Sequence, residues 1–173
     1  EDHAFAGCSN LTTLNFLSSL TRIGEFLTYG SSISKGNIYI SDYSAFCKSS
    51  IVSQLMKEDF RSPITLLDVD GNGIKDFTIP DGVTSISSGA FYNCSGLTSI
   101  TIPDGVVSIG ESAFNNCSGL TSITVPNSVT SIGESAFQGC KGLTSLTLPE
   151  NLSIIKRQAI YGCSSLESIT IPA

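Results

Sequence analysis

The sequence lacks most of the residues on which catalytic sites are built. It has one histidine, His3, no tryptophan and one methionine among 173 residues. A single histidine close to the N-terminus excludes most arrangements of nucleophile, histidine and acid. The acidic residues fall on expected surface turns, whereas a glycosidase needs two carboxyl groups that face each other across a cleft. We therefore expect a protein that is not an enzyme and that needs no cofactor.

Charge is also scarce. Charged residues make up 14% of the chain, and the net charge is −6. An acidic chain without clusters of Lys and Arg is a poor partner for nucleic acid or for an anionic membrane surface. No apolar run approaches the ~18 residues of a membrane-spanning helix, and no signal peptide opens the chain. We expect neither nucleic-acid binding nor membrane insertion.

What the sequence has in abundance is a repeat of 23 residues. Five pairs of an apolar residue and proline return at this spacing: Ile79-Pro80, Ile102-Pro103, Val125-Pro126, Leu148-Pro149 and Ile171-Pro172. Other residues locked to the same period are Cys94, Cys117, Cys140 and Cys163, the isoleucines Ile86, Ile109, Ile132 and Ile155, and the aromatics Phe91, Phe114 and Phe137. A fixed period with apolar residues in register is the mark of a solenoid.

One repeat contains one clear strand signal. Residues 97–103 alternate and end in Pro103, which has no backbone donor and stops the hydrogen-bond ladder. The side chains expected to point inward are Leu97, Ile100 and Ile102, and those expected outward are Ser99 and Thr101. Gly110 is expected to permit a tight bend before Phe114 closes the coil. No repeat buries its own apolar set, so stability comes from stacked neighbours.

The repeat resembles that of the BspA-like leucine-rich repeat proteins, which occur on the surfaces of bacteria. The shared unit is SIGESAFxxCxGLTSITVPxxV, and the resemblance covers residues 79–173. It implies a β-rich solenoid, a right-handed coil of leucine-rich-repeat type with short parallel strands, interrupted by a small α/β insert. It also implies an extracellular or cell-surface location, and host extracellular matrix or bacterial surface proteins as partners. Because Glu1 falls within a repeat and the chain ends directly after a strand, we expect a longer parent protein.

The period fails between about residues 25 and 66. We divide the chain into an N-terminal repeat fragment (1–26), an inserted irregular module (27–66) and a solenoid (67–173). In the insert, residues 24–36 are expected to form a loop and residues 37–40 a strand. A helix should follow, capped by Ser41 or Asp42, with Tyr43, Phe46 and Cys47 at helical spacing. Residues 51–58 are expected to extend that helix or to form a second one.

The stretch DVDGNGIKD (residues 68–76) resembles a calcium-binding loop. Four of its residues match ligand positions of an EF-hand: Asp68, Asp70, Asn72 and Asp76. The twelfth position, normally a bidentate acid, is Ile79, which belongs to the repeat core. We therefore favour a metal-free β-hairpin in which residues 66–69 turn through 70–73 into 74–79, because Asp-Gly and Asn-Gly suit hairpin turns. Calcium binding is the alternative.

Six cysteines raise the question of disulfides. Four of them share one position of the repeat, so their side chains should run parallel, with Cβ directions unsuited to bridging. There is no C-x-x-C pair that would indicate a metal site. We predict six free thiols that fill small apolar spaces.

The outward strand positions form two columns of small hydroxyl residues. The columns are Ser99, Ser122, Ser145 and Ser168, and Thr101, Thr124, Thr147 and Thr170, with Thr13, Asn15, Asp76 and Thr78 as extensions. The extended strand surface of a solenoid is its usual binding face. The alternative is that Ser and Thr are merely soluble strand residues, because the columns lack the Tyr, Trp and Arg that anchor strong interfaces.

These observations predict a non-catalytic, monomeric module for protein–protein interaction and adhesion, on the surface of a bacterial cell or secreted. Each repeat would contribute weakly, and many repeats would add up to a useful affinity. One alternative is a structural spacer that holds other domains off the cell surface. Another is an accessory domain that binds carbohydrate.

Overall fold

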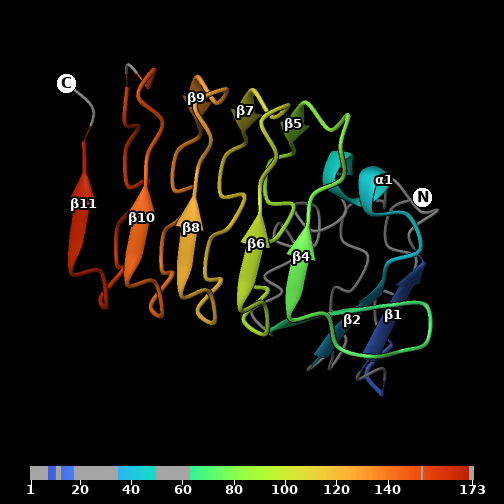
Figure 1. Cartoon of the computed structure of the whole chain (residues 1–173). Helices are drawn as coiled ribbons and strands as arrows, with labels where there is room; N and C mark the ends of the chain where they lie inside the picture. Colours follow the sequence, from blue (N-terminus) through green and yellow to red (C-terminus); the bar gives the residue numbers. More distant parts are fainter. Residues whose placement is uncertain (1–7, 11–12, 18–34, 50–62, 153, 172–173) are drawn as a thin grey trace.

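The computed structural model describes residues 8–10, 13–17, 35–49, 63–152 and 154–171. Its main feature is a stack of similar coils, each of which runs through a strand on one side and returns on the other (Figure 1). The expected parallel solenoid with short strands is confirmed. No helix in the described ranges is long and apolar enough to cross a membrane.

The first side of the stack carries the strand that the alternation predicts. Its strands are β4 (Asp76–Thr78), β6 (Ser99–Thr101), β8 (Ser122–Thr124), β10 (Ser145–Thr147) and β11 (Ser168–Thr170). Pairing is parallel between β4 and β6, and among β8, β10 and β11. Each residue lies opposite the residue 23 positions later, so Ser145 pairs with Ser168 and Leu146 with Ile169. The sequence period is therefore also the spatial register.

The second and third sides of each coil are also bonded to the next coil. The second side carries the two-residue parallel strands β5 (Ser85–Ile86), β7 (Ser108–Ile109) and β9 (Ser131–Ile132). On the third side, the backbone amides of Phe91, Phe114 and Phe137 each donate to the carbonyl of the alanine 22 residues later, at 2.8 Å. Hydrogen bonds between coils thus satisfy the backbone on all three sides, as buried polar groups require.

Stacked aromatic rings fill the centre of the coils. The ring centroids of Phe91 and Phe114 are 5.2 Å apart, and those of Phe114 and Phe137 are 5.4 Å apart, with nearly parallel planes. All three side chains are fully buried. The inward isoleucines and leucines of each strand are also buried, whereas their Ser and Thr neighbours are exposed. The predicted inward and outward positions are confirmed.

A helix covers the first coil of this stack. Helix α1 (Tyr43–Lys48) is capped by Asp42, whose Oδ1 accepts a hydrogen bond from the amide of Ala45 at 2.9 Å. Phe46 packs edge-on against Phe91, with ring centroids 5.3 Å apart. The carbonyl of Cys47 accepts from the amide of Ser87 at 3.0 Å, the bond that a preceding coil would otherwise supply. The predicted helix and its cap are confirmed, and α1 stands in for a coil.

The strands before the solenoid form a sheet of their own. It consists of β1 (Thr13–Leu17), β2 (Lys35–Tyr39) and β3 (Ile64–Leu67), all parallel, in the order β1-β2-β3. Strand β2 begins at residue 35, so the predicted loop at 24–36 is wrong at its end, and the rest of it lies outside the described residues. The second helical segment expected at 51–58 also lies outside them.

The expected hairpin at residues 66–79 is confirmed at its turn, but its antiparallel pairing ends there. A tight turn is present, in which the amide of Ile74 donates to the carbonyl of Leu66 at 2.8 Å. Within the described residues of this segment, one antiparallel bridge joins Leu67 to Gly73. Strand β3 pairs with β2 and strand β4 pairs with β6, so the two arms join different sheets. The pairing partners on either side offer each arm a longer ladder than the two arms offer each other.

The last described coil departs from the register on its second side. Ile155, expected to continue the isoleucine column, is 40% exposed, and Ile154 is 65% exposed. The two preceding coils have Gly110 and Gly133 directly after this column, and a Cβ there would meet the previous coil at 2.5 and 2.4 Å. The last coil has Lys156 in that place, which prevents the same close approach. The strand column of the second side therefore ends at β9.

Candidate functional site

The strand face is the surface formed by the outward residues of β4, β6, β8, β10 and β11, which lie side by side along the stack (Figure 1). In β4, β6, β8 and β10 the first and third residues are exposed and the middle residue is buried. Of the eight predicted residues, Ser122, Thr124, Ser145, Thr147, Ser168 and Thr170 lie in one paired ladder. Ser99 and Thr101 pair with β4, and their strand β6 contacts β8 without a ladder between the two. Strand neighbours in a ladder are about 4.8 Å apart, so each column is a row of hydroxyl groups at that spacing.

One end of the strand face differs from the rest. Asp76 and Thr78 extend the two columns onto β4, opposite Ser99 and Thr101. The Asp76 carboxylate accepts a hydrogen bond from the Ser99 hydroxyl at 2.6 Å. The suggested extension to Thr13 and Asn15 stays a prediction: these residues lie in β1, which forms a sheet with β2 and β3 that does not contain β4.

The hydroxyl groups of the strand face are available to a partner. Among the described residues, Ser99 is the only one of the eight with a side-chain hydrogen bond inside the molecule. The threonines that precede the strands behave differently, since the Thr98 and Thr144 hydroxyls donate to carbonyls of the preceding coil at 3.2 and 3.0 Å. The hydroxyls of Thr98 and Thr144 are thus bonded to the preceding coil, whereas those of Ser145 and Thr147 on the face itself have no bond within the described residues.

This arrangement suits contact and not reaction. Each hydroxyl can both donate and accept a hydrogen bond. The face contains no histidine, no cysteine and no aromatic side chain, and its only carboxylate is that of Asp76. It therefore presents a flat polar lattice on which an extended polar partner can form repeated hydrogen bonds.

The candidate calcium loop is held by its own side chains. The Asp68 carboxylate accepts from the backbone amides of Asp70 at 3.0 Å and Asn72 at 2.8 Å, and from the Asn72 side chain at 3.1 Å. The hydrogen bonds from Asn72 hold the pKa of Asp68 below its usual value. Asp76 instead lies on β4 and is engaged by Ser99. Within the described ranges, no cluster of His, Cys, Asp and Glu is placed to hold a metal ion.

All six cysteines are free thiols, as predicted. Their role in the repeat was not foreseen from the sequence. The Sγ atoms of Cys117, Cys140 and Cys163 donate to the carbonyls of Phe91, Phe114 and Phe137 at 2.9, 3.1 and 3.1 Å. Each bond crosses from one coil to the preceding one. The constant spacing of 26 residues from phenylalanine to cysteine is the signal that would have revealed it.

Comparison with known families and structures gives a consistent result. A family model described as a BspA-type leucine-rich repeat region matches residues 1–62 and 70–173, in six copies. The fold is similar to that of a leucine-rich repeat protein from Eubacterium ventriosum, with 23% identity and a TM-score of 0.58 over 99% of this chain and 57% of that one.

Two further solved structures are similar. A leucine-rich repeat protein from Bacteroides ovatus has 23% identity and a TM-score of 0.54, over 95% of this chain and 50% of that one. A leucine-rich cell surface protein from Faecalibacterium prausnitzii has 19% identity and a TM-score of 0.54, over 96% of this chain and 61% of that one. The chain spans between 50% and 61% of the length of these three proteins. A search of curated proteins finds no match.

Proposed function

Since the chain belongs to the BspA-type leucine-rich repeat family, we propose that it is a non-catalytic module for protein binding and adhesion in a bacterial surface or secreted protein. The observation that carries this proposal is the strand face, where exposed hydroxyl residues lie in register on consecutive coils. The partner is a protein of the host extracellular matrix or of a bacterial surface, and the module itself is monomeric.

The chemistry of the strand face favours an adhesive role built from many weak contacts. Serine and threonine hydroxyls form hydrogen bonds worth about 0.5–1.5 kcal/mol each against competing water. The face has no Tyr, Trp or Arg that would anchor a partner strongly. Affinity therefore grows with the number of coils in contact, as in other multivalent surfaces.

A location outside the cell agrees with the description of one structural neighbour. The protein from Faecalibacterium prausnitzii is described as a cell surface protein. Six free cysteines do not conflict with this location, because the four that recur in the repeats are buried or half-buried and do not pair. A spacer and a carbohydrate-binding domain are the competing functions, and the following experiment separates them.

The test is binding of the chain to an immobilised panel of extracellular matrix proteins, bacterial surface proteins and glycans. The variant Thr101→Arg/Thr124→Arg adds two bulky side chains to neighbouring rungs of the strand face without touching the core. The matched control is Val107→Arg/Thr130→Arg, which adds the same charge one repeat apart on the second side, where Val107 is 47% exposed and Thr130 is exposed.

We expect saturable binding to a protein of the panel that the strand-face variant loses and the control retains. Binding that both variants retain would place the contact elsewhere and contradict the proposed surface. Binding to glycans alone would establish the carbohydrate-binding function instead. An absence of binding across the panel would favour the spacer.

A further inference from the structure

The stacking of coils is interrupted at the first turn of the solenoid. At Gly119 and Gly142, an added Cβ would lie 2.4 and 2.5 Å from carbonyl oxygens of the preceding coil. At Gly96, the equivalent residue of the first coil, no atom of the described residues lies within 4 Å of such an atom. The chain that should lie beneath Gly96 has turned back toward β3 through the bridge between Leu67 and Gly73. The space that a regular coil would occupy is left open.

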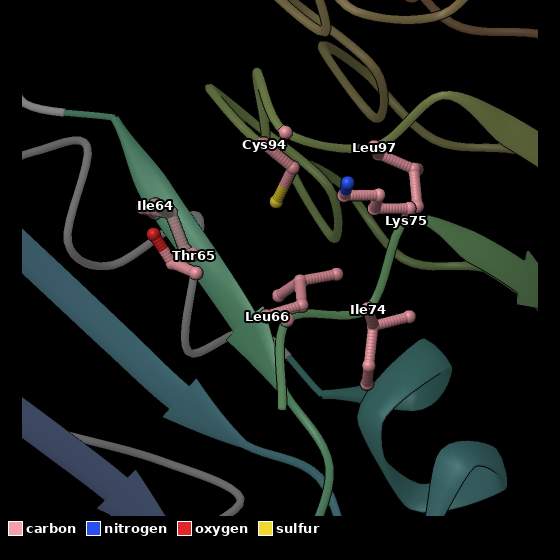
Figure 2. Close-up of a pocket in the computed structure, with 9 residues that line it drawn as sticks. Ile64, Thr65, Leu66, Ile74, Lys75, Cys94 and Leu97 are labelled. Carbon is pink, nitrogen blue, oxygen red and sulfur yellow. The ribbon is translucent and has the colours of Figure 1, made fainter. Parts of the chain in front are cut away.

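Cys94, in the same turn, also lacks the contact with a preceding coil that its counterparts make. The thiols of the three later repeats donate to a carbonyl of the preceding coil at 2.9–3.1 Å. The Cys94 thiol has no such partner among the described residues, and it donates instead to the carbonyl of Tyr92 in its own turn, at 3.8 Å. Figure 2 shows the Cys94 sulfur directed toward the side on which β3 lies.

The open space is a cavity of about 140 Å³. Its walls come from β3, from the residues that lead into β4, and from the Cys94 turn (Figure 2). Apolar side chains dominate the lining: Ile64, Leu66, Ile74 and Leu97. Among the described residues that line it, the one charged group is Lys75 (Figure 2).

We propose that this cavity binds a small organic anion, a monocarboxylate with a short unbranched apolar tail. A cavity of about 150 Å³ with apolar walls accepts a guest the size of benzene, so the tail is limited to a few carbons. The tail lies among Ile64, Leu66 and Leu97, and the carboxylate meets the Lys75 ammonium. The proposal is independent of the strand face.

We expect an anion because the ammonium group of Lys75 has no acidic partner within the described ranges. No acidic side chain within the described ranges forms an ion pair with its ammonium group. The residue is exposed, and its apolar stem lines the cavity while the ammonium group reaches solvent, as lysine side chains commonly do. A hydrogen bond between an ammonium and a carboxylate contributes more than one between neutral groups. A neutral guest of the same shape lacks that contact.

The experiment is a titration of the whole chain with pentanoate, followed by methyl NMR. We expect saturable shifts confined to the methyl groups of Ile64, Leu66, Ile74 and Leu97. The neutral analogue 1-pentanol should bind at least about tenfold more weakly, as loss of a charge-assisted hydrogen bond implies. Acetate, which has almost no tail, should give no saturable shifts.

Two variants and one control locate the site. Lys75→Met keeps the length of the side chain and should weaken pentanoate binding about tenfold while leaving 1-pentanol unchanged. Gly96→Leu fills the open space and should abolish binding of both compounds. Lys141→Met removes an exposed lysine from the equivalent turn two coils later and should change nothing.

Each contrary result is decisive. Absence of shifts with pentanoate in the unaltered chain would overturn the site. Equal affinity for pentanoate and 1-pentanol, or full affinity in Lys75→Met, would overturn the selection of an anion. Binding that survives in a folded Gly96→Leu protein would place the guest elsewhere. Because Lys75 is exposed, its variant is informative even if Gly96→Leu fails to fold.

Discussion

At the scale of the residue, Gly110 and Gly133 are explained by the closeness of the preceding coil and not by an unusual backbone conformation. The tight bend expected at Gly110 suggests a positive φ, yet Gly110 is not among the residues with positive φ. Non-glycine residues that do have a positive φ include Asn93, Ser112 and Asn116. What Gly110 requires is space, since a Cβ there would lie 2.5 Å from the amide nitrogen of Ser88.

The substitution Gly110→Ala is accordingly expected to lower the free energy of unfolding by about 1–3 kcal/mol, the usual cost of forcing extra atoms into a packed interior. The matched control is Gly105→Ala, whose Cβ would make an ordinary contact at 3.9 Å with the carbonyl of Val83. It should change stability by less than about 0.5 kcal/mol. Urea unfolding measures both, and equal losses in the two variants would contradict the account.

The buried thiols lead to a second prediction, on how the free energy of unfolding depends on pH. Burial raises the pKa of Cys47 from its ordinary value of 9.0 to about 12, and burial also raises the pKa of Cys94 and Cys117. Above pH 9 the unfolded chain loses these protons while the folded protein keeps them. Stability is therefore intact below pH 9 and falls as the pH rises from there toward 12.

Each such thiol contributes a slope of about 1.4 kcal/mol per pH unit in that range. The variant Cys47→Ala should unfold with a shallower dependence on pH between 9 and 12, by about the slope of one thiol. Tyrosines and lysines titrate in the same range, but they are common to both proteins and cancel in the difference. Urea unfolding at several pH values gives the two slopes, and parallel curves would refute the prediction.

At the scale of the element, helix α1 replaces a coil at one end of the stack. Its N-cap bond, from the amide of Ala45 to Asp42, fixes where the helix begins. Its last turn then places the Cys47 carbonyl against Ser87 and the Phe46 ring against Phe77 and Phe91. Loss of the cap should therefore weaken both the helix and the covering of the first coil.

We expect Asp42→Ala to cost about 1 kcal/mol of unfolding free energy, as for other N-cap residues. The substitution Asp42→Ser keeps an acceptor at this place and should cost clearly less. Denaturant unfolding of the two variants side by side is the measurement. If serine and alanine are equally destabilising, the cap bond is not what Asp42 contributes.

Most of the elements could be predicted from the sequence because they obey the repeat. A subtraction of 23 places Ser122 opposite Ser145 and Thr124 opposite Thr147, and alternation turns these residues outward. The spacing of Phe46 and Cys47 after Asp42 likewise predicts a capped helix. Each of these inferences needs only local pattern and one fixed period.

The inferences that failed concern departures from the period. The hairpin was expected to pair residues 66–69 with 74–79, yet β3 pairs with β2 and β4 pairs with β6, and a cavity lies between them. The choice of β3 to pair with β2 is a competition between partners far apart in the chain, which local turn residues such as Asp70 and Gly71 do not reveal. The cavity arises from that competition, and no periodic signal marks it.

At the scale of the whole molecule, stability should be unevenly distributed along the stack. Coils of a solenoid contact only their neighbours, so a coil with fewer bonds can open alone. In the centre, the amide of Gly133 donates to the carbonyl of Ile109 at 2.8 Å and that of Phe114 to Ala136 at the same distance. In the coil of residues 154–171, the amide of residue 156 makes no such bond to the carbonyl of Ile132. The reason is that Lys156 replaces the glycine at this position.

Hydrogen exchange should therefore be slowest at amides of the central coils, such as Phe114, and much faster in residues 154–171.

The variant Lys156→Gly removes the side chain that keeps the coil of residues 154–171 away from the preceding coil. It lets residue 156 donate to the carbonyl of Ile132, as Gly133 donates to Ile109. We expect exchange within residues 154–160 to slow about tenfold or more, the effect of one further bond of about 1.4 kcal/mol between coils. Mass spectrometry of exchanged peptides measures the change. The matched substitution Lys141→Gly, on a turn that is already in register, should leave those peptides unaltered. Uniform exchange across all coils would mean that the stack opens as a single unit, and it would contradict the dependence on neighbours.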